Sequence, residues 1–190
     1  MLALAIGLLL FLGVHSVRIV AGPWRERQIL HFGESAWKGM HSLLSLVGLV
    51  LIVIGYVWAR QQPLILWVPP VGMRHAAALL TLIAFILIAA AYVPRNAIRS
   101  RLRHPMIIGV KVWALAHLLA NGALHDILLF GAFLLWAIVD FRSARRRQPA
   151  PVVAVSTMAG NVGTVVAGVA IWALFAFYLH ELLIGVPPLG

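Results

Sequence analysis

Long apolar blocks constrain this chain more than any other feature of its sequence. Each block holds about 20 residues, the length at which a helix crosses roughly 30 Å of hydrocarbon. A helix also satisfies its own backbone N–H and C=O groups, which lipid cannot do. The pattern predicts an all-α fold, a polytopic membrane helical bundle of about six transmembrane helices. The predicted spans are residues 2–22, 39–58, 71–93, 105–122, 124–141 and 163–185.

The composition indicates that lipid, and not water, is the main solvent of the chain. Hydrophobic residues make up 63% of the 190 residues and charged residues only 11%, and the loops are too short to form a soluble domain. We expect one transmembrane domain over residues 1–190. The sequence has no cysteine, which excludes disulfides, thiolate ligands and covalent c-type haem attachment.

The chain has 15 Lys and Arg against 5 Asp and Glu, and the basic residues gather in alternate loops. They lie between apolar blocks and not on a soluble face, so we expect membrane lipid around the chain and no nucleic-acid partner. Because Lys and Arg concentrate in cytoplasmic loops, we predict a multi-pass protein of the bacterial inner (plasma) membrane with both termini in the periplasm. The basic residues of the first, third and fifth loops are Arg18, Arg25, Arg27 and Lys38; Arg95, Arg99, Arg101 and Arg103; and Arg142, Arg145, Arg146 and Arg147, against Arg60 and Arg74 on the other side.

Two ionisable residues, His15 and Arg18, lie inside the first span. They are three positions apart, so they share a helix face. An ionisable residue within a span usually faces the bundle interior and is a candidate for a functional site. The alternatives are a hydrogen-bonded core histidine at position 15 and an arginine that snorkels to the cytoplasmic interface at position 18. In the second span, His41 is a further candidate ligand. It lies on a helix face with polar residues that is typical of packing against another helix.

The fourth span carries Trp113, His117 and Asn121 at intervals of four residues. This spacing places all three on one helix face, where they could line a cofactor slot. A neutral imidazole nitrogen there could bind iron. The alternative is a buried histidine that is hydrogen-bonded across the bundle.

Several short motifs occur along the chain in a defined order and spacing. They are His15 followed by Arg18, Gly33-Glu34, the R-H-P of Arg103 to Pro105, Gly109, the W-A-L-A-H of Trp113 to His117, and the F-G-x-F-L-x-W of Phe130 to Trp136. In this order and spacing, the motifs resemble those of the NnrU family over nearly the whole chain. That family comprises bacterial inner-membrane proteins linked to nitrite and nitric oxide metabolism, and it is related to 15-cis-zeta-carotene isomerase.

The resemblance implies a haem b with His15 and His117 as its axial metal ligands. Trp113 and Asn121 would line the slot, and Arg18 or Lys111 would pair with a propionate. The implied roles are nitrite or nitric oxide metabolism or an isomerase-like redox chemistry on an apolar or isoprenoid small molecule. The isomerase has a cysteine in its second motif where this chain has Ala114, which argues against isomerase activity and leaves it open whether the chain is an enzyme.

Two other functions stay open at this point. One is a non-catalytic membrane protein partner of a nitrogen-oxide reductase. The other is that of a membrane methyltransferase that modifies isoprenylcysteine or phospholipids, because the pattern R-H-P-x-x-x-G resembles a motif of those enzymes. Those enzymes have an acidic motif after a following helix, whereas residues 140–147 here are mostly basic.

The alternation of basic loops makes a testable prediction of topology. A reporter fused after Arg147 should be cytoplasmic and one fused after Gly190 periplasmic, because the last span separates them. Alkaline phosphatase and green fluorescent protein fusions measure this directly. The same location for both reporters would remove the sixth span.

Overall fold

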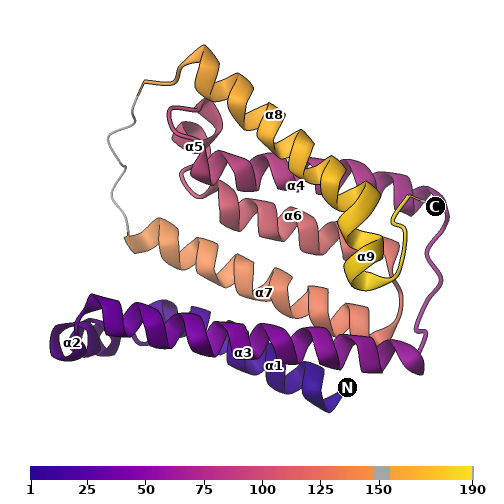
Figure 1. Cartoon of the computed structure of the whole chain (residues 1–190), viewed down its shortest axis with the longest axis horizontal. Helices are drawn as coiled ribbons and strands as arrows, with labels where there is room; N and C mark the ends of the chain where they lie inside the picture. The colour runs from indigo at the N-terminus through magenta and orange to yellow at the C-terminus, as the bar shows by residue number, and fades with distance from the viewer. Residues whose placement is uncertain (148–154, 190) are drawn as a thin grey trace. The chain divides into compact units, whose positions relative to one another are not determined.

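The computed structural model describes residues 1–147 and 155–189, and this part of the chain is helical apart from turns, loops and one bridge between Ile65 and Ala123 (Figure 1). Six helical runs coincide with the six predicted spans. They are α1 (Leu2–Val20), α3 (Glu34–Gln61), α4 (Gly72–Tyr92), α6 (Pro105–Ala120), α7 (Leu124–Arg147) and a last run of α8 (Met158–Leu174), η1 (Phe175–Leu179) and α9 (His180–Ile184).

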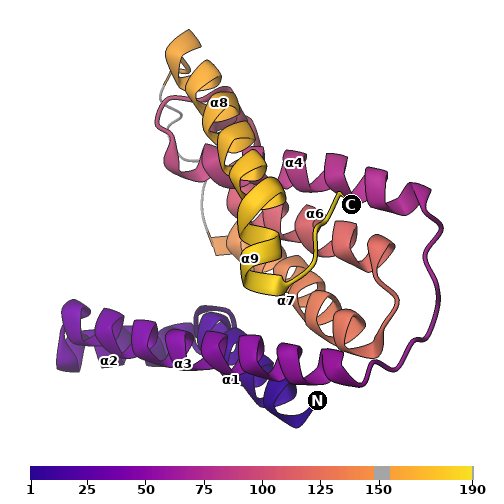
Figure 2. The ribbon, with the colours of Figure 1, turned by 45° about the vertical axis from the view of Figure 1, so that its right-hand side comes forward.

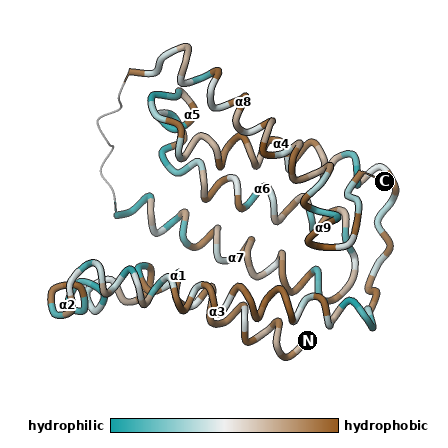
Figure 3. The backbone as a smooth tube through the Cα atoms, viewed as in Figure 1, coloured by the Kyte–Doolittle hydropathy of each residue, from teal (hydrophilic) through white to brown (hydrophobic). Residues whose placement is uncertain are grey.

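Two further helices, α2 (Gly22–Phe32) and α5 (Ala97–Leu102), lie in the first and third basic loops. Both contain hydrophilic stretches (Figure 3). The sequence pattern did not predict them as helices. Helix α2 has a proline in its first turn and ends at Gly33, whose φ of 85° suits glycine. Helix α5 is capped by the side chain of Asn96, which accepts a hydrogen bond from the Arg99 backbone N–H at 2.7 Å.

The helix lengths agree with a membrane bundle. Among the described residues, five runs are long and apolar enough to cross a bilayer, and α6 is a shorter apolar helix of 16 residues. Together they account for about six spans. The chain is therefore an all-α, multi-pass membrane helical bundle.

The helices group into two compact units. The first unit comprises Met1–Leu66 and Ala123–Ala132, and the second comprises Trp67–Gly122 and Phe133–Gly190. Helix α7 contributes its first part to the first unit and the remainder to the second.

In the first unit, α1 runs alongside α3 with the two backbones in close contact (Figures 1 and 2). A Cβ atom on Gly7 would lie 2.6 Å from the Ile52 backbone nitrogen, and one on Gly48 would lie 2.8 Å from that of Phe11. Small residues at such positions let helices approach closely enough for extensive van der Waals contact. This contact sets the register that brings the end of α1 next to the start of α3.

In the second unit, α4 packs against both α6 and α8. Gly109 of α6 faces the Ala84 carbonyl of α4, where an added Cβ would lie 2.9 Å from that oxygen. The indole N–H of Trp172 donates to the Thr81 hydroxyl at 3.1 Å and links α8 to α4. A polar contact of this kind stabilises helix association where lipid offers no other partner.

The glycine contact between α1 and α3 predicts a strong position dependence. Gly48→Ala should destabilise the protein by about 1–3 kcal/mol, because its methyl group would overlap the backbone of Phe11. Gly13→Ala, on the same helix pair but with nothing within 4 Å of its added Cβ, should be neutral or slightly stabilising. Unfolding in detergent, followed by circular dichroism, compares them. Equal effects of the two substitutions would contradict the assigned register.

Candidate functional site

His15 lies near the end of α1, and its ring is held by two neighbours. Its Nδ1 donates to the Phe11 carbonyl oxygen at 2.7 Å, one turn earlier on the same helix. The Phe11 ring stacks on it with a centroid separation of 4.3 Å. Because a carbonyl oxygen can only accept, Nδ1 carries the proton, and the lone pair of the neutral ring is on Nε2.

His41 of α3 contacts the same ring. The His15 and His41 ring centroids are 5.0 Å apart in an edge-to-face arrangement. Rings in edge contact leave no room for a flat macrocycle between them. This pair therefore cannot supply the two axial ligands of one haem, although both rings face a common space.

That space is a pocket of about 290 Å³ formed by α1, α2 and α3 within the first unit. Its polar and aromatic lining residues come from all three helices. They are His15 and Arg18 from α1, Arg25 from α2, and Trp37, Lys38, His41 and Ser42 from α3. Among the described residues, those that line it include no carboxylate, so the pocket suits an anion.

The cationic side chains of the pocket are positioned by their surroundings. The Arg25 guanidinium lies 5.8 Å from the centroid of the buried Trp37 ring, within the range of a cation–π contact. Trp24 meets the same indole edge-on, with centroids 5.8 Å apart. Lys38 pairs with Glu34 one turn earlier, at 2.9 Å between Nζ and Oε1. The sequence pattern indicates only a topological role for Arg25 and Lys38, whereas the structure brings both to the candidate site.

In the second unit, Trp113, His117 and Asn121 share one face of α6, as their spacing predicts. The Trp113 and His117 ring centroids are 5.1 Å apart, and the Asn121 side-chain amide donates to the His117 carbonyl at 2.9 Å. Phe133 of α7 also meets the Trp113 ring, edge to face, with centroids 5.6 Å apart. The structure thus gathers the predicted residues of this helix, all half-buried, into one cluster.

His117 has the same internal hydrogen bond as His15. Its Nδ1 donates to the Trp113 carbonyl at 2.9 Å, four residues earlier. In both histidines, Nε2 is therefore the nitrogen with metal-binding character, and the other nitrogen is oriented by a backbone carbonyl, as is usual for ligating histidines. The donor chemistry of each residue fits a haem iron. His15 belongs to the first unit and His117 to the second.

A buried polar cluster at the other end of α3 was not predicted from the sequence. The Tyr56 hydroxyl donates to Asp126 Oδ1 at 2.7 Å, and His125 Nε2 lies 3.6 Å from the same oxygen. His125 and Asp126 are each only 5% exposed. A carboxylate beside a histidine at the start of an apolar helix is the sequence signal that could have found it.

The R-H-P motif begins α6. His104 precedes the helix, Pro105 is its first residue, and Arg103 has a positive φ of 64°. The His104 ring meets Phe141 of α7 edge-on at 6.2 Å. Burial lowers the pKa of His104 below its usual value, and the nearby Arg145 guanidinium lowers it further. The third loop and the basic end of α7 therefore lie at the same end of the second unit, as the alternation of basic loops requires.

Lys111 of α6 contacts the same aromatic ring. Its Nζ is 3.7 Å from the centroid of Phe141, a cation–π contact. Within the described residues, no group of three or more His, Cys, Asp or Glu side chains could hold a metal ion.

The helices and these polar clusters define the class of protein: a polytopic helical membrane protein with histidines inside its spans. The model of one family, described as NnrU protein, matches residues 3–188 and runs through both units. The chain belongs to the NnrU family. No curated protein and no solved structure matches it.

The Tyr56–Asp126 hydrogen bond predicts a measurable stability effect. Tyr56→Phe should destabilise the protein by about 1–3 kcal/mol, because the buried carboxylate would lose a hydrogen-bond donor. Tyr92→Phe is the matched control: this tyrosine is 72% exposed, and its hydroxyl reaches only the Met106 sulfur, at 3.6 Å. Detergent unfolding measures both variants. A Tyr56→Phe protein as stable as the control would show that Asp126 does not depend on this bond.

Proposed function

We propose that this NnrU-family protein binds a haem b, with His15 and His117 as axial ligands. One observation carries the proposal. In each of these two residues, Nδ1 donates a hydrogen bond to the backbone carbonyl four residues earlier. It leaves Nε2 as the ligand nitrogen in both and fixes each ring to its own helix. The pairing of the two residues rests on the family resemblance.

The other proposed residues have supporting roles. Trp113 packs against the His117 ring and limits its rotation. Asn121 caps the helix that carries His117 by a hydrogen bond to the His117 carbonyl. Arg18, one turn beyond His15, supplies a positive charge for a propionate. Lys111 is less suited to that role because its ammonium group lies over Phe141. A bound haem would supply electron transfer or ligand exchange at its iron, and His15 and His117 would supply the nitrogens that hold it.

The proposed role is redox chemistry linked to nitrite or nitric oxide metabolism in the bacterial inner membrane, with both termini periplasmic. An isomerase-like reaction has less support. The position of the isomerase cysteine is occupied by Ala114, which is fully buried in α6 and offers no sulfur for ligand exchange. A non-catalytic partner of a nitrogen-oxide reductase remains the alternative from another class. The methyltransferase alternative has no specific support, because the R-H-P residues begin a helix and pack against Phe141.

Visible spectroscopy tests the haem proposal. The wild-type protein, purified in detergent after haem supplementation, should show a six-coordinate low-spin haem spectrum with a strong Soret band. His15→Ala or His117→Ala should convert it to a five-coordinate spectrum or abolish haem binding, because one axial nitrogen is lost.

His180→Ala is the matched control, because this histidine also bonds a backbone carbonyl through Nδ1, that of Val186 at 2.6 Å, but lies outside the motifs. Its spectrum should equal that of the wild type. A colourless wild-type protein would sink the haem proposal and leave the partner and methyltransferase alternatives. Unchanged spectra in both ligand variants would move the ligand assignment to His41 and His104.

A further inference from the structure

We propose that the pocket between α1, α2 and α3 binds the phosphate head group of an acidic phospholipid, with Arg25 and Lys38 as its cationic ligands. The proposal goes beyond the proposed function, since neither residue has a role in haem ligation. It rests on the size, charge and location of the pocket.

The size of the pocket suits a head group. Its volume of about 290 Å³ is at the lower limit of small-molecule pockets, which range from about 300 to 1,000 Å³. A glycerophosphate group fits a space of this size.

The charge of the pocket suits an oxyanion. Arg25 and Lys38 line it, and a guanidinium can donate two parallel hydrogen bonds to phosphate oxygens. Glu34 partly neutralises Lys38, so Arg25 should contribute most. His41 and Ser42 add polar groups on the α3 wall.

The location of the pocket favours a lipid over a soluble anion. Helix α3 has 28 residues, so it is roughly 42 Å long and exceeds the ~30 Å hydrocarbon thickness. The excess of roughly 12 Å lies outside the hydrocarbon, and the polar first turn, with Glu34 and Lys38, suits the head-group region. The buried Trp37 and its neighbour Trp24 are the aromatic residues expected at that depth.

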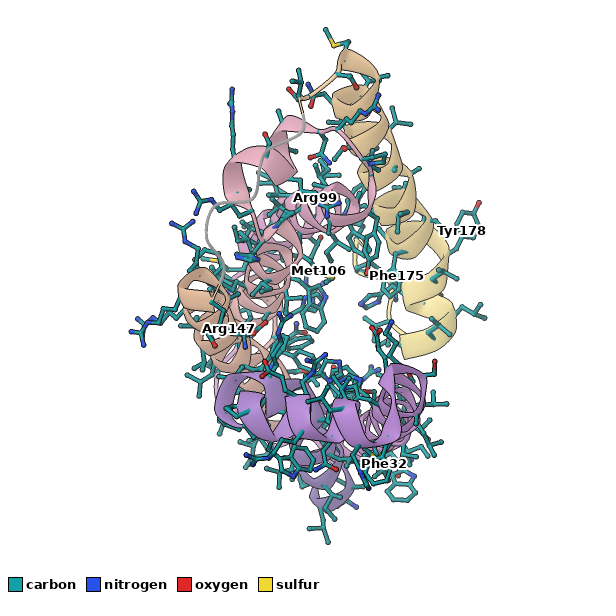
Figure 4. All side chains as sticks on the ribbon, turned by 90° about the vertical axis from the view of Figure 1, so that its left-hand side faces the viewer. Phe32, Arg99, Met106, Arg147, Phe175 and Tyr178 are labelled. Atoms are coloured by element: carbon teal, nitrogen blue, oxygen red, sulfur yellow. The ribbon has the colours of Figure 1, made fainter. Side chains whose placement is uncertain are left out.

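Helix α2 supports the same depth. It lies at the end of the α1–α3 pair opposite the N-terminus (Figure 1), and it is too short and too polar to span. Leu30 is 85% and Phe32 62% exposed on this helix, and the Phe32 side chain points outward (Figure 4). Arginines beside exposed apolar side chains are typical of a helix that lies in the membrane interface and attracts anionic lipids.

Lipid retention by the full-length protein tests the proposal. The purified protein is incubated with equal amounts of phosphatidylglycerol and phosphatidylcholine of the same acyl chains, and retained lipid is counted by native mass spectrometry. The wild type should retain phosphatidylglycerol preferentially. Arg25→Gln should reduce this retention about tenfold, because it removes a charge-assisted hydrogen bond to phosphate.

Arg27→Gln is the matched control: it makes the same charge change on the same helix, but its exposed side chain does not line the pocket. This variant should retain phosphatidylglycerol like the wild type. Lys38→Gln is a second test variant, at an exposed position, should Arg25→Gln fail to fold. It should also lower retention.

Four results would overturn the proposal. The first is equal retention of the two lipids by the wild type, and the second is an equal loss of lipid retention in Arg25→Gln and Arg27→Gln. The third is displacement of the lipid by millimolar inorganic phosphate, which would identify a soluble anion as the ligand. The fourth is a changed haem spectrum in Arg25→Gln with unchanged lipid retention, which would assign the pocket to a propionate. A colourless protein that still selects phosphatidylglycerol would overturn the haem proposal alone.

Discussion

The first unit depends on the close approach of the α1 and α3 backbones at Gly7 and Gly48. Between helices in lipid there is little hydrophobic driving force, so association relies on van der Waals contact, and only glycine permits it at this distance. The contact also fixes the relative register of the two helices. Because of that register, the His15 ring meets His41, and the end of α1 forms one wall of the pocket.

On the same helix pair, an apolar middle section lies between two polar regions. One region is the pocket near His41, and the other is the hydrogen-bonded Tyr56 and Asp126. Fifteen residues separate His41 from Tyr56, roughly 22 Å along a helix. Each polar region is confined to one end of α3, where the cost of burying polar groups is lower than at the centre of the bilayer.

The sequence predicted the spans well, because apolar length in a membrane protein is set by the bilayer and not by tertiary packing. It also predicted that Trp113, His117 and Asn121 share a face, since helical spacing alone determines this. It did not predict α2, whose weak apolar periodicity is interrupted by charges. Nor did it predict the role of Arg25 beside Trp37 or of Asp126 beside Tyr56. Those contacts join residues from different helices, and the sequence of one helix does not determine its register against another.

The length of α6 has a consequence for the membrane around it. Its 16 residues extend roughly 24 Å, several ångströms less than the hydrocarbon thickness. Such hydrophobic mismatch is relieved when the bilayer thins locally or when water reaches deeper at a helix end. His117 is three residues from the last residue of α6, so its ring lies close to this water-accessible boundary. Protons and small polar molecules would therefore reach it over a short path, whereas the middle of the longer α4 stays far from water.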